Sequence, residues 1–171
     1  MNLLAPYVAL ALLGPGPEPF ATLEFESTIT QLDVAPRAGL VAVAGESGAV
    51  RLVDASTLVV RRSLSVAASP LDLALSADGA WLAIQTEPGK VTVWRLSSEE
   101  PAHELALDEG TFAFSAEAAQ LVLADLTGSV RRIDLETGEV VASHQFEDRR
   151  RVEGVDISRD GRVVAFAVDD G

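Results

Sequence analysis

The sequence has no cysteine, one lysine and few aromatic residues, which make up 5% of the chain. Without cysteine the protein forms no disulfide bond and carries no lipid-modified cysteine, although this absence suits oxidising and reducing compartments equally well. Basic residues are also scarce, since 13 lysines and arginines stand against 26 acidic residues and give a net charge of −13. Such a charge argues against non-specific binding to nucleic acid, which needs a basic surface, and favours a solvated, soluble surface.

Motifs for catalysis are missing as well. The sequence contains no glycine-rich phosphate loop, no nucleophile elbow and no His-Glu metal motif. Its two histidines, His103 and His144, accompany no carboxylate or cysteine motif that would complete a metal site. Neither has an identifiable serine partner to activate. We therefore expect no catalytic residue, no metal and no cofactor in this chain.

The main apolar run is short. Residues 3–13 (LLAPYVALALL) include Pro6 and are too few to cross a bilayer as a helix, so we expect no integral membrane span. Their length suits the core of a secretory signal peptide, which favours a secreted or periplasmic location over a cytoplasmic one. No lysine or arginine precedes the run and no clear cleavage site follows it, so a buried strand or an artefactual start site are alternatives. We expect residues 1–19 to be a signal-like segment with a Gly/Pro linker.

What the chain does contain is a repeat. Four segments align without gaps at spacings of 41, 39 and 43 residues. They read LDVAPRAGLVAVAGESGAVRLVD (32–54), LALSADGAWLAIQTEPGKVTVWR (73–95), FAFSAEAAQLVLADLTGSVRRID (112–134) and VDISRDGRVVAFAVDDG (155–171). Self-similarity at this period indicates a radial or stacked β architecture. Because one unit cannot bury its hydrophobic faces alone, the copies must pack on one another.

Each copy predicts the same series of strands. The first strand alternates, as in Leu32 and Val34, which is typical of a half-buried strand. The second is apolar on both faces, which predicts a strand covered from both sides; these runs are 40–44, 81–84, 121–124 and 163–167. Alanine stands at the centre of three of them, where we expect a neighbouring sheet to approach closely: Ala42, Ala83 and Ala165. A third strand follows in three copies, and a more polar fourth strand (about 58–65, 102–107 and 139–146) protects the edge.

Turn residues recur with the strands. Glycine closes the second turn at the same place in every copy, which predicts a positive φ that glycine adopts at little cost. These glycines are Gly48, Gly89, Gly128 and Gly171. Trp94 takes the place of Val53 and Ile133 in other copies, and Trp81 takes the place of Leu40 and Gln120. Because most of these equivalents are aliphatic, we expect both tryptophans in the core. Asp33 and Asp156 recur in first strands, as hydrogen-bond acceptors between strands or as solvent-facing residues.

The unit resembles the blade of the WD-repeat family of β-propellers. The third strands end in Asp54, Trp94-Arg95 and Ile133-Asp134, similar to the Trp-Asp ending of that family, and the Ser-x-Asp-Gly turns at 76–79 and 158–161 are similar too. The resemblance covers residues 20–171. No copy has the family's Gly-His pair, or Trp and Asp together, so its internal Asp-His-Ser-Trp network carries over to no residue here. The resemblance implies an all-β fold, a β-propeller of four-stranded antiparallel blades with degenerate repeats.

The repeats amount to about three and a half blades, at residues 29–66, 70–108, 111–147 and 152–171. Closed propellers have about 4–8 blades. We therefore expect the chain to be a fragment of a longer propeller; a ring made of two copies and an open array are alternatives. The segment ATLEFE (21–26) precedes the first unit, in the place of a fourth strand that would latch a closed ring.

A basic cluster is the best candidate for a partner contact. Arg149, Arg150 and Arg151 lie between the last strand of the third blade and the first strand of the fourth. In a propeller this loop shares a face with the turns that carry acidic residues. Those candidate contacts are Glu46, Glu87 and Asp125. A solvated loop balanced by its acidic neighbours is the alternative.

Two functions fit these observations. The first, implied by the resemblance, is a non-catalytic scaffold that binds a protein or peptide partner through its propeller loops. The second is the N-terminal part of a secreted or periplasmic propeller enzyme or cofactor-binding protein, whose site lies in further blades. We expect the scaffold, because nothing catalytic is visible in the sequence, and we also expect self-association through open blade edges.

Overall fold

The computed structural model of the chain describes residues 7–8, 23–87, 89–117, 119–147 and 151–169. Most of the signal-like segment, Arg149, Arg150 and Gly171 lie outside the described residues. Every regular element in the described part is a β-strand, and none of its elements is a helix long and apolar enough to cross a membrane.

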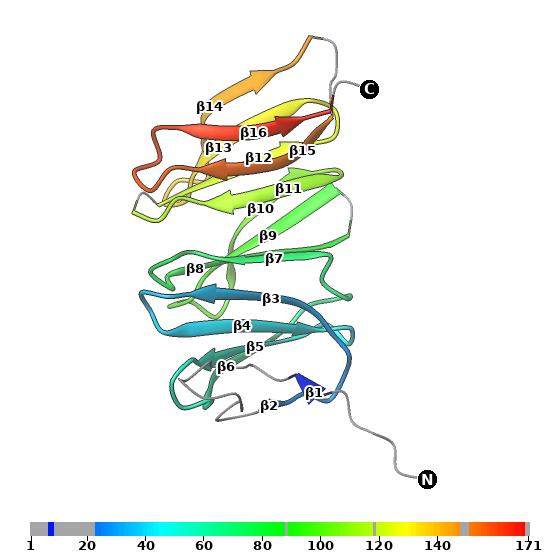
Figure 1. The fold of residues 1–171 in the computed structure, drawn as a ribbon, viewed down its shortest axis with the longest axis vertical. Coiled ribbons are helices and arrows are strands. Elements are labelled where there is room, and N and C mark those ends of the chain that lie inside the picture. Colours follow the sequence, from blue (N-terminus) through cyan, green and yellow to red (C-terminus); the bar gives the residue numbers. More distant parts are fainter. Residues whose placement is uncertain (1–6, 9–22, 88, 118, 148–150, 170–171) are drawn as a thin grey trace, which may run out of the picture.

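From residue 29 onwards the described strands form consecutive antiparallel meanders, three sheets of four strands and one pair, in which neighbours in sequence are neighbours in space (Figure 1). We call these units blades 1 to 4. Blade 1 holds β3 (Ile29–Ala35), β4 (Leu40–Gly45), β5 (Ala49–Asp54) and β6 (Val60–Ser65). Blade 2 holds β7 (Asp72–Leu75), β8 (Trp81–Glu87), β9 (Gly89–Arg95) and β10 (Pro101–Leu107). Blade 3 holds β11 (Gly110–Phe114), β12 (Gln120–Asp125), β13 (Ser129–Asp134) and β14 (Val140–Gln145), and blade 4 is the pair β15 (Val152–Ile157) and β16 (Val164–Val168).

The turns have the chemistry that the repeat predicts. Gly48, Gly89 and Gly128 have φ angles of 81°, 100° and 86°, which confirms the expected positive φ at the three of these glycines that the structure describes. In the first hairpin of blade 2, the Ser76 hydroxyl donates to Asp78 and accepts from the Trp81 amide. The first hairpin of blade 4 repeats both bonds with Ser158, Asp160 and Val163. Local side-chain bonds of this kind fix a tight turn without help from the rest of the fold.

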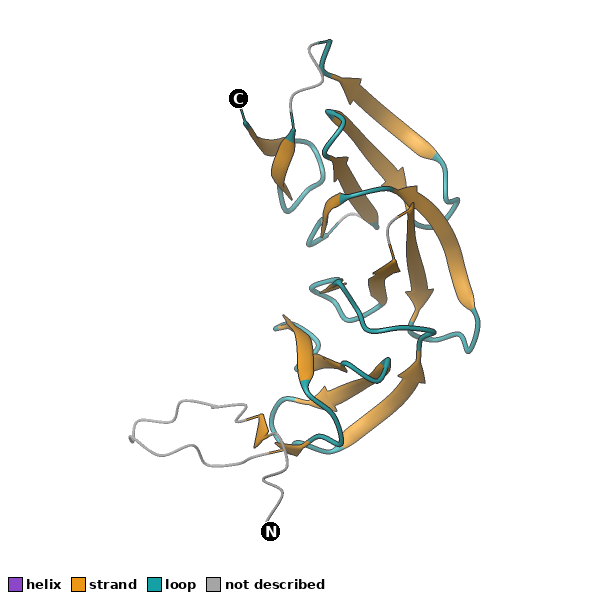
Figure 2. Cartoon of the chain, turned by 90° about the vertical axis from the view of Figure 1, so that its right-hand side faces the viewer, coloured by secondary structure: helices purple, strands orange, loops and turns teal. Residues whose placement is uncertain are grey.

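The blades stack in an arc, with their first strands along its concave side (Figure 2). β3 contacts β7, β7 contacts β11, and β11 contacts β15. The hydrophobic core lies between successive blades, and each layer takes residues from both of its neighbours. Ala42 and Ala83 are fully buried in these layers, as predicted, and Trp81 and Trp94 belong to them too.

The two ends of the arc depart from the predicted burial. Leu32 and Val34 are 44% and 42% exposed, although Leu73 and Leu75, which take the same places in blade 2, are 5% and 6% exposed. The second strand of blade 4 was expected to be covered on both faces, but Val163 is 63% exposed and Ala165 is exposed too. These expectations are wrong at both ends for the same reason: an end blade has a neighbouring blade on only one side, so the residues on its other side stay exposed.

A further pair of strands precedes blade 1, formed by β1 (Tyr7–Val8) and β2 (Leu23–Glu24). Phe25 follows β2 and is buried against the outer side of blade 1, where Val41 and Val43 lie. The Arg51 guanidinium stands 4.6 Å from the Phe25 ring centre and donates to the Glu24 carbonyl. In blade 3 the equivalent Arg131 donates to a carbonyl of β10 in the preceding blade. β2 therefore contacts blade 1 as β10 contacts blade 3.

Candidate functional site

Loops gather at two opposite faces of the arc, because connections in an antiparallel sheet alternate between its two ends. One face carries the turns between second and third strands, together with the connections from each blade to the next. We call it the linker face. The other carries the turns between first and second strands and those between third and fourth strands, and we call it the hairpin face.

The described residues among the predicted partner contacts lie on the linker face. Glu46 and Glu87 are exposed in the second turns of blades 1 and 2, and Asp125 is half-buried in that of blade 3. Arg151 is exposed, and its carbonyl accepts a 3.0 Å bond from the Asp169 amide, which ties the loop before β15 to the end of β16. Arg149 and Arg150 lie outside the described residues, so the predicted cluster stays a prediction.

Backbone bonds hold the turns of the linker face to the adjoining connections. The Gly48 carbonyl accepts from the Val66 amide at 2.9 Å, and the Gly128 carbonyl accepts from the Phe146 amide at 3.0 Å. Asp125 is occupied with its own turn, since one carboxylate oxygen accepts from the Thr127 amide, the Thr127 hydroxyl and the Ser129 amide. This face presents short, rigid turns, and the Asp125 carboxylate is less free for a partner than those of Glu46 and Glu87.

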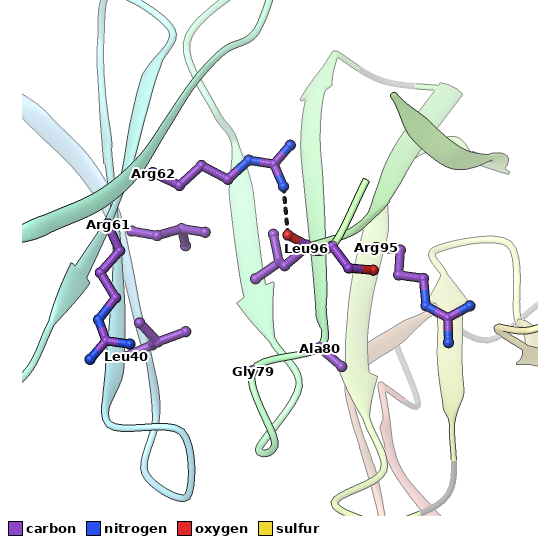
Figure 3. A pocket seen from close by; sticks show the side chains of 9 residues that line it. Leu40, Arg61, Arg62, Gly79, Ala80, Arg95 and Leu96 are labelled. Atoms are coloured by element: carbon purple, nitrogen blue, oxygen red, sulfur yellow. Dashed lines mark hydrogen bonds between the residues drawn. The ribbon is translucent and has the colours of Figure 1, made fainter. Parts of the chain in front are cut away.

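The hairpin face carries a pocket that the sequence did not predict. It lies between blades 1 and 2 and has a volume of about 420 Å³ (Figure 3). Leucine side chains from both blades give it an apolar wall, and arginines provide its charged groups. The lining residues are Leu40, Leu52, Arg61, Arg62, Gly79, Ala80, Arg95, Leu96 and Ser97.

Arg62 joins the two blades across this pocket. Its guanidinium donates to the carbonyl of Leu96 at 2.7 Å and to that of Ser98 at 2.6 Å, and the first bond is drawn in Figure 3. The side chain is 17% exposed, and the nearest carboxylate, that of Glu99, lies 4.0 Å away on a side chain that is 97% exposed. Such an ion pair is weak in water, so the carbonyls orient Arg62 while its charge is poorly neutralised.

Arg61 lies on the blade 1 side, beside Leu40 (Figure 3). Its guanidinium forms an ion pair with Asp54, whose other oxygen accepts from the Ser56 hydroxyl, the Ser56 amide and the Thr57 amide. These bonds, that of the Ser56 hydroxyl first and that of Arg61 second, hold the pKa of Asp54 well below its usual range. Asp54 is therefore ionised at neutral pH, and it anchors one nitrogen of Arg61 at the edge of the pocket.

Arg95 contributes its stem rather than its charge. Its guanidinium makes a bidentate pair with Glu136 of blade 3, with both bonds at 3.0 Å, and lies 5.2 Å from the ring centre of Trp81. Figure 3 shows the head of Arg95 directed away from Leu40 and Arg61. The cationic groups available to the pocket are thus Arg61 and Arg62.

The corresponding place between blades 2 and 3 has a different lining. His103 stands there in the position of Arg62, opposite Val93 as Arg62 is opposite Leu52. Its Nε2 lies 2.7 Å from the Leu135 carbonyl, and its ring is stacked on Trp81 at 6.3 Å. His103 therefore binds one blade to the next. Within the described part of the chain no group of three His, Cys, Asp or Glu side chains could hold a metal ion.

The sequence carried a weak signal for the pocket. Arg62, His103 and Ala142 take equivalent positions in successive fourth strands, so the repeat does not fix this residue. A polar side chain at this position of a fourth strand indicates that the side chain can contact the next blade. The carbonyl that Arg62 contacts, that of Leu96, lies 34 residues further along the sequence in the next unit. The repeat pattern does not predict that these two groups meet in space.

No model of a known protein family matches the sequence, and no curated protein matches it either. Among solved structures, the chain is similar to the β-propeller domain of Cps50 (Swd1) from Myceliophteria thermophila, with 16% sequence identity and a TM-score of 0.69. The similarity covers 88% of this chain and 52% of that one, so the chain spans about half the length of the propeller it matches. This similarity shows the fold: blades 1 to 4 are blades of a β-propeller, arranged in an open arc.

Proposed function

We propose that the chain is part of a non-catalytic, WD-repeat-like scaffold that binds a protein or peptide partner through the loops of its linker face. The observation that carries the proposal is the construction of that face. Its turns are short, and backbone bonds such as those of Gly48 with Val66 and of Gly128 with Phe146 tie them to the connections beside them. A rigid surface loses little conformational entropy when a partner binds, which favours recognition.

Charge gives this face its specificity. Glu46 and Glu87 extend from two of its turns, and Arg151, which is exposed, precedes β15 at the far end of the arc. The sequence predicts that Arg149 and Arg150 add positive charge beside Arg151. A partner with charges of the opposite pattern would be steered and oriented by such a surface. The similarity to a solved β-propeller agrees with this proposal at the level of the fold.

The test replaces the cluster and a matched set of arginines. One variant carries Arg149→Ala, Arg150→Ala and Arg151→Ala; the control carries Arg37→Ala, Arg159→Ala and Arg162→Ala, which lie in first-hairpin turns on the hairpin face. Both variants lose the same charge. Partners are captured on the immobilised chain, identified by mass spectrometry, and their affinities are then measured with each purified partner.

We expect the linker-face variant to bind at least about tenfold more weakly and the control to bind as the wild type does. The proposal fails if every identified partner binds all three proteins equally. It also fails if the control loses as much affinity as the linker-face variant, because the effect would then follow net charge rather than position.

A further inference from the structure

The pocket between blades 1 and 2 gathers arginine side chains in an acidic protein. Three of the chain's twelve arginines line it, although the chain has a net charge of −13. Arg95 is paired with Glu136 and Arg61 with Asp54, so Arg62 carries the least neutralised charge. The surrounding negative charge would repel anions from most of the surface. Beside Arg62, by contrast, an anionic group would meet a positive charge whose nearest carboxylate, that of Glu99, lies 4.0 Å away on an exposed side chain.

Among the arginines of the pocket, Arg62 has the least neutralised charge. Its side chain is mostly buried, and its two bonds are to carbonyl oxygens, which accept hydrogen bonds without cancelling the charge. A poorly neutralised guanidinium beside an apolar wall is energetically unfavourable. A carboxylate in the pocket would supply the missing negative charge, and the fork of an arginine suits carboxylate geometry.

Arg61 supplies a second cation at the same opening. Its ion pair with Asp54 engages one nitrogen of the guanidinium, and the side chain is 59% exposed. Because an arginine has five N–H donors, Arg61 can hold Asp54 and still donate to a guest.

The rest of the lining favours a ligand that carries an apolar group next to its carboxylate. Leu40 and Leu52 come from blade 1, and Leu96 and Ala80 come from blade 2, so apolar surface faces the cavity from both sides. A bare ion such as phosphate leaves this surface unused. An acidic side chain next to a leucine-like side chain, as in a peptide, satisfies both the arginines and the apolar wall.

The geometry points to this pocket as a binding site for an acidic peptide segment that pairs a glutamate or aspartate with an apolar neighbour. The site goes beyond the proposed function, because it lies on the hairpin face, opposite the loops that the scaffold proposal uses. Variants of one face leave the other intact, so the two proposals can fail separately.

Fluorescence polarisation with the whole chain tests the site. The probe is a labelled peptide of alternating glutamate and leucine, compared with glutamine–leucine and lysine–leucine peptides of equal length. The variants are Arg61→Gln and Arg62→Gln, with Arg162→Gln as the matched control, whose side chain is 85% exposed in a first-hairpin turn of the same face. Arg62→Lys keeps the charge and loses the fork. Circular dichroism shows which variants remain folded, and Arg61→Gln keeps the test decisive if Arg62→Gln unfolds.

We expect salt-sensitive binding of the acidic peptide, weakened about tenfold or more in Arg61→Gln and Arg62→Gln, unchanged in Arg162→Gln, and partly retained in Arg62→Lys. Equal binding of the glutamine peptide, no saturable binding, or equal losses in Arg61→Gln and Arg162→Gln would overturn the inference. Inorganic phosphate at constant ionic strength should not displace the peptide. Displacement by phosphate would overturn the assignment to an acidic peptide and transfer the site to a phosphate group.

Discussion

At the scale of single residues, two carboxylates meet on neighbouring inner strands. Asp33 accepts a 2.6 Å bond from the Leu75 amide of the next blade, as expected for an inter-strand acceptor, and Asp72 accepts from the Leu73 amide. Burial raises the pKa of Asp72, and the nearby charge of Asp33 raises it further against the opposing effect of that amide. The ionised form of Asp72 is therefore disfavoured in the folded protein.

Asp72→Asn should stabilise the protein at neutral pH. The raised pKa means that the folded state binds a proton more readily than the unfolded chain, whose aspartates titrate at about 3.9. The penalty for the ionised form is present above the folded pKa and disappears as the pH falls towards the unfolded value. Urea melts at neutral pH should therefore show a higher midpoint for the variant, and the difference should vanish in acid.

Asp156→Asn is the matched control. Asp156 also accepts from the amide of its following residue, Ile157, but it is exposed. Its replacement should leave the midpoint unchanged at both pH values. A gain in both variants, or in neither, would show that burial of the Asp72 charge is not the cause.

Gly48→Ala should destabilise the protein more than Gly39→Ala does. Both glycines have positive φ, 81° and 59°, so an alanine at either position suffers left-handed strain of about 1 kcal/mol. A Cβ at Gly48 would also lie 2.4 Å from the Val66 carbonyl oxygen, whereas nothing lies within 4 Å of one at Gly39. Chemical denaturation should show a loss of about 1 kcal/mol for Gly39→Ala and a larger loss for Gly48→Ala; equal losses would contradict the close approach.

At the scale of elements, fourth strands tie each blade to the next. Arg62 of β6 and His103 of β10 occupy equivalent positions, and each reaches the carbonyl at the start of the third turn in the following blade, at 2.7 Å in both cases. In blade 3 the equivalent residue is Ala142, and Arg132 of β13 instead donates to the Gly161 carbonyl of blade 4. Different side chains thus perform the same structural task along the arc.

His103→Ala should lower the free energy of unfolding by about 1–2 kcal/mol, because the Leu135 carbonyl loses its partner and Trp81 loses a stacked ring. His144→Ala is the comparison, since His144 is exposed on β14 and contributes ring contacts with Phe146 and Phe166. It should cost about 0.5 kcal/mol. Similar losses in urea melts of the two variants would show that the bond between blades contributes little.

Much of this architecture could be predicted from the sequence, because strands and turns are local. Alternation marked the strands, and Gly48, Gly89 and Gly128 marked turns whose φ angles are positive. The order of the strands also predicted that the turns carrying Glu46, Glu87 and Asp125 share one face. The pocket could not be predicted, because it depends on the distance between blades and on the length of Arg62, which reaches a carbonyl in the next unit. The repeat specifies which residues are equivalent, but not what a side chain meets across a blade interface.

At the scale of the whole molecule, burial depends on position along the arc rather than on residue type. Equivalent leucines show this directly, since Leu73 lies between blades 1 and 2 whereas Leu32 lies on the outer side of blade 1. The stability of stacked units is roughly the sum of each unit's own stability and its contacts with neighbours. An end blade therefore contributes less than a middle blade with the same sequence pattern.

The variants Leu73→Ala and Leu32→Ala measure how this difference in burial affects stability. Leu73 is 5% exposed, so its truncation should cost about 2–5 kcal/mol, as in other cores. Leu32 is 44% exposed, so the same change there should cost less than about 1 kcal/mol. Urea melts of both variants give the difference, and light scattering of the wild type gives its mass at the same concentration.

A monomer with unequal costs agrees with an open arc in solution. A dimer in which Leu32→Ala is as costly as Leu73→Ala would show instead that a second copy covers the outer side of blade 1, because an aqueous surface cannot make the loss of three side-chain carbons so expensive.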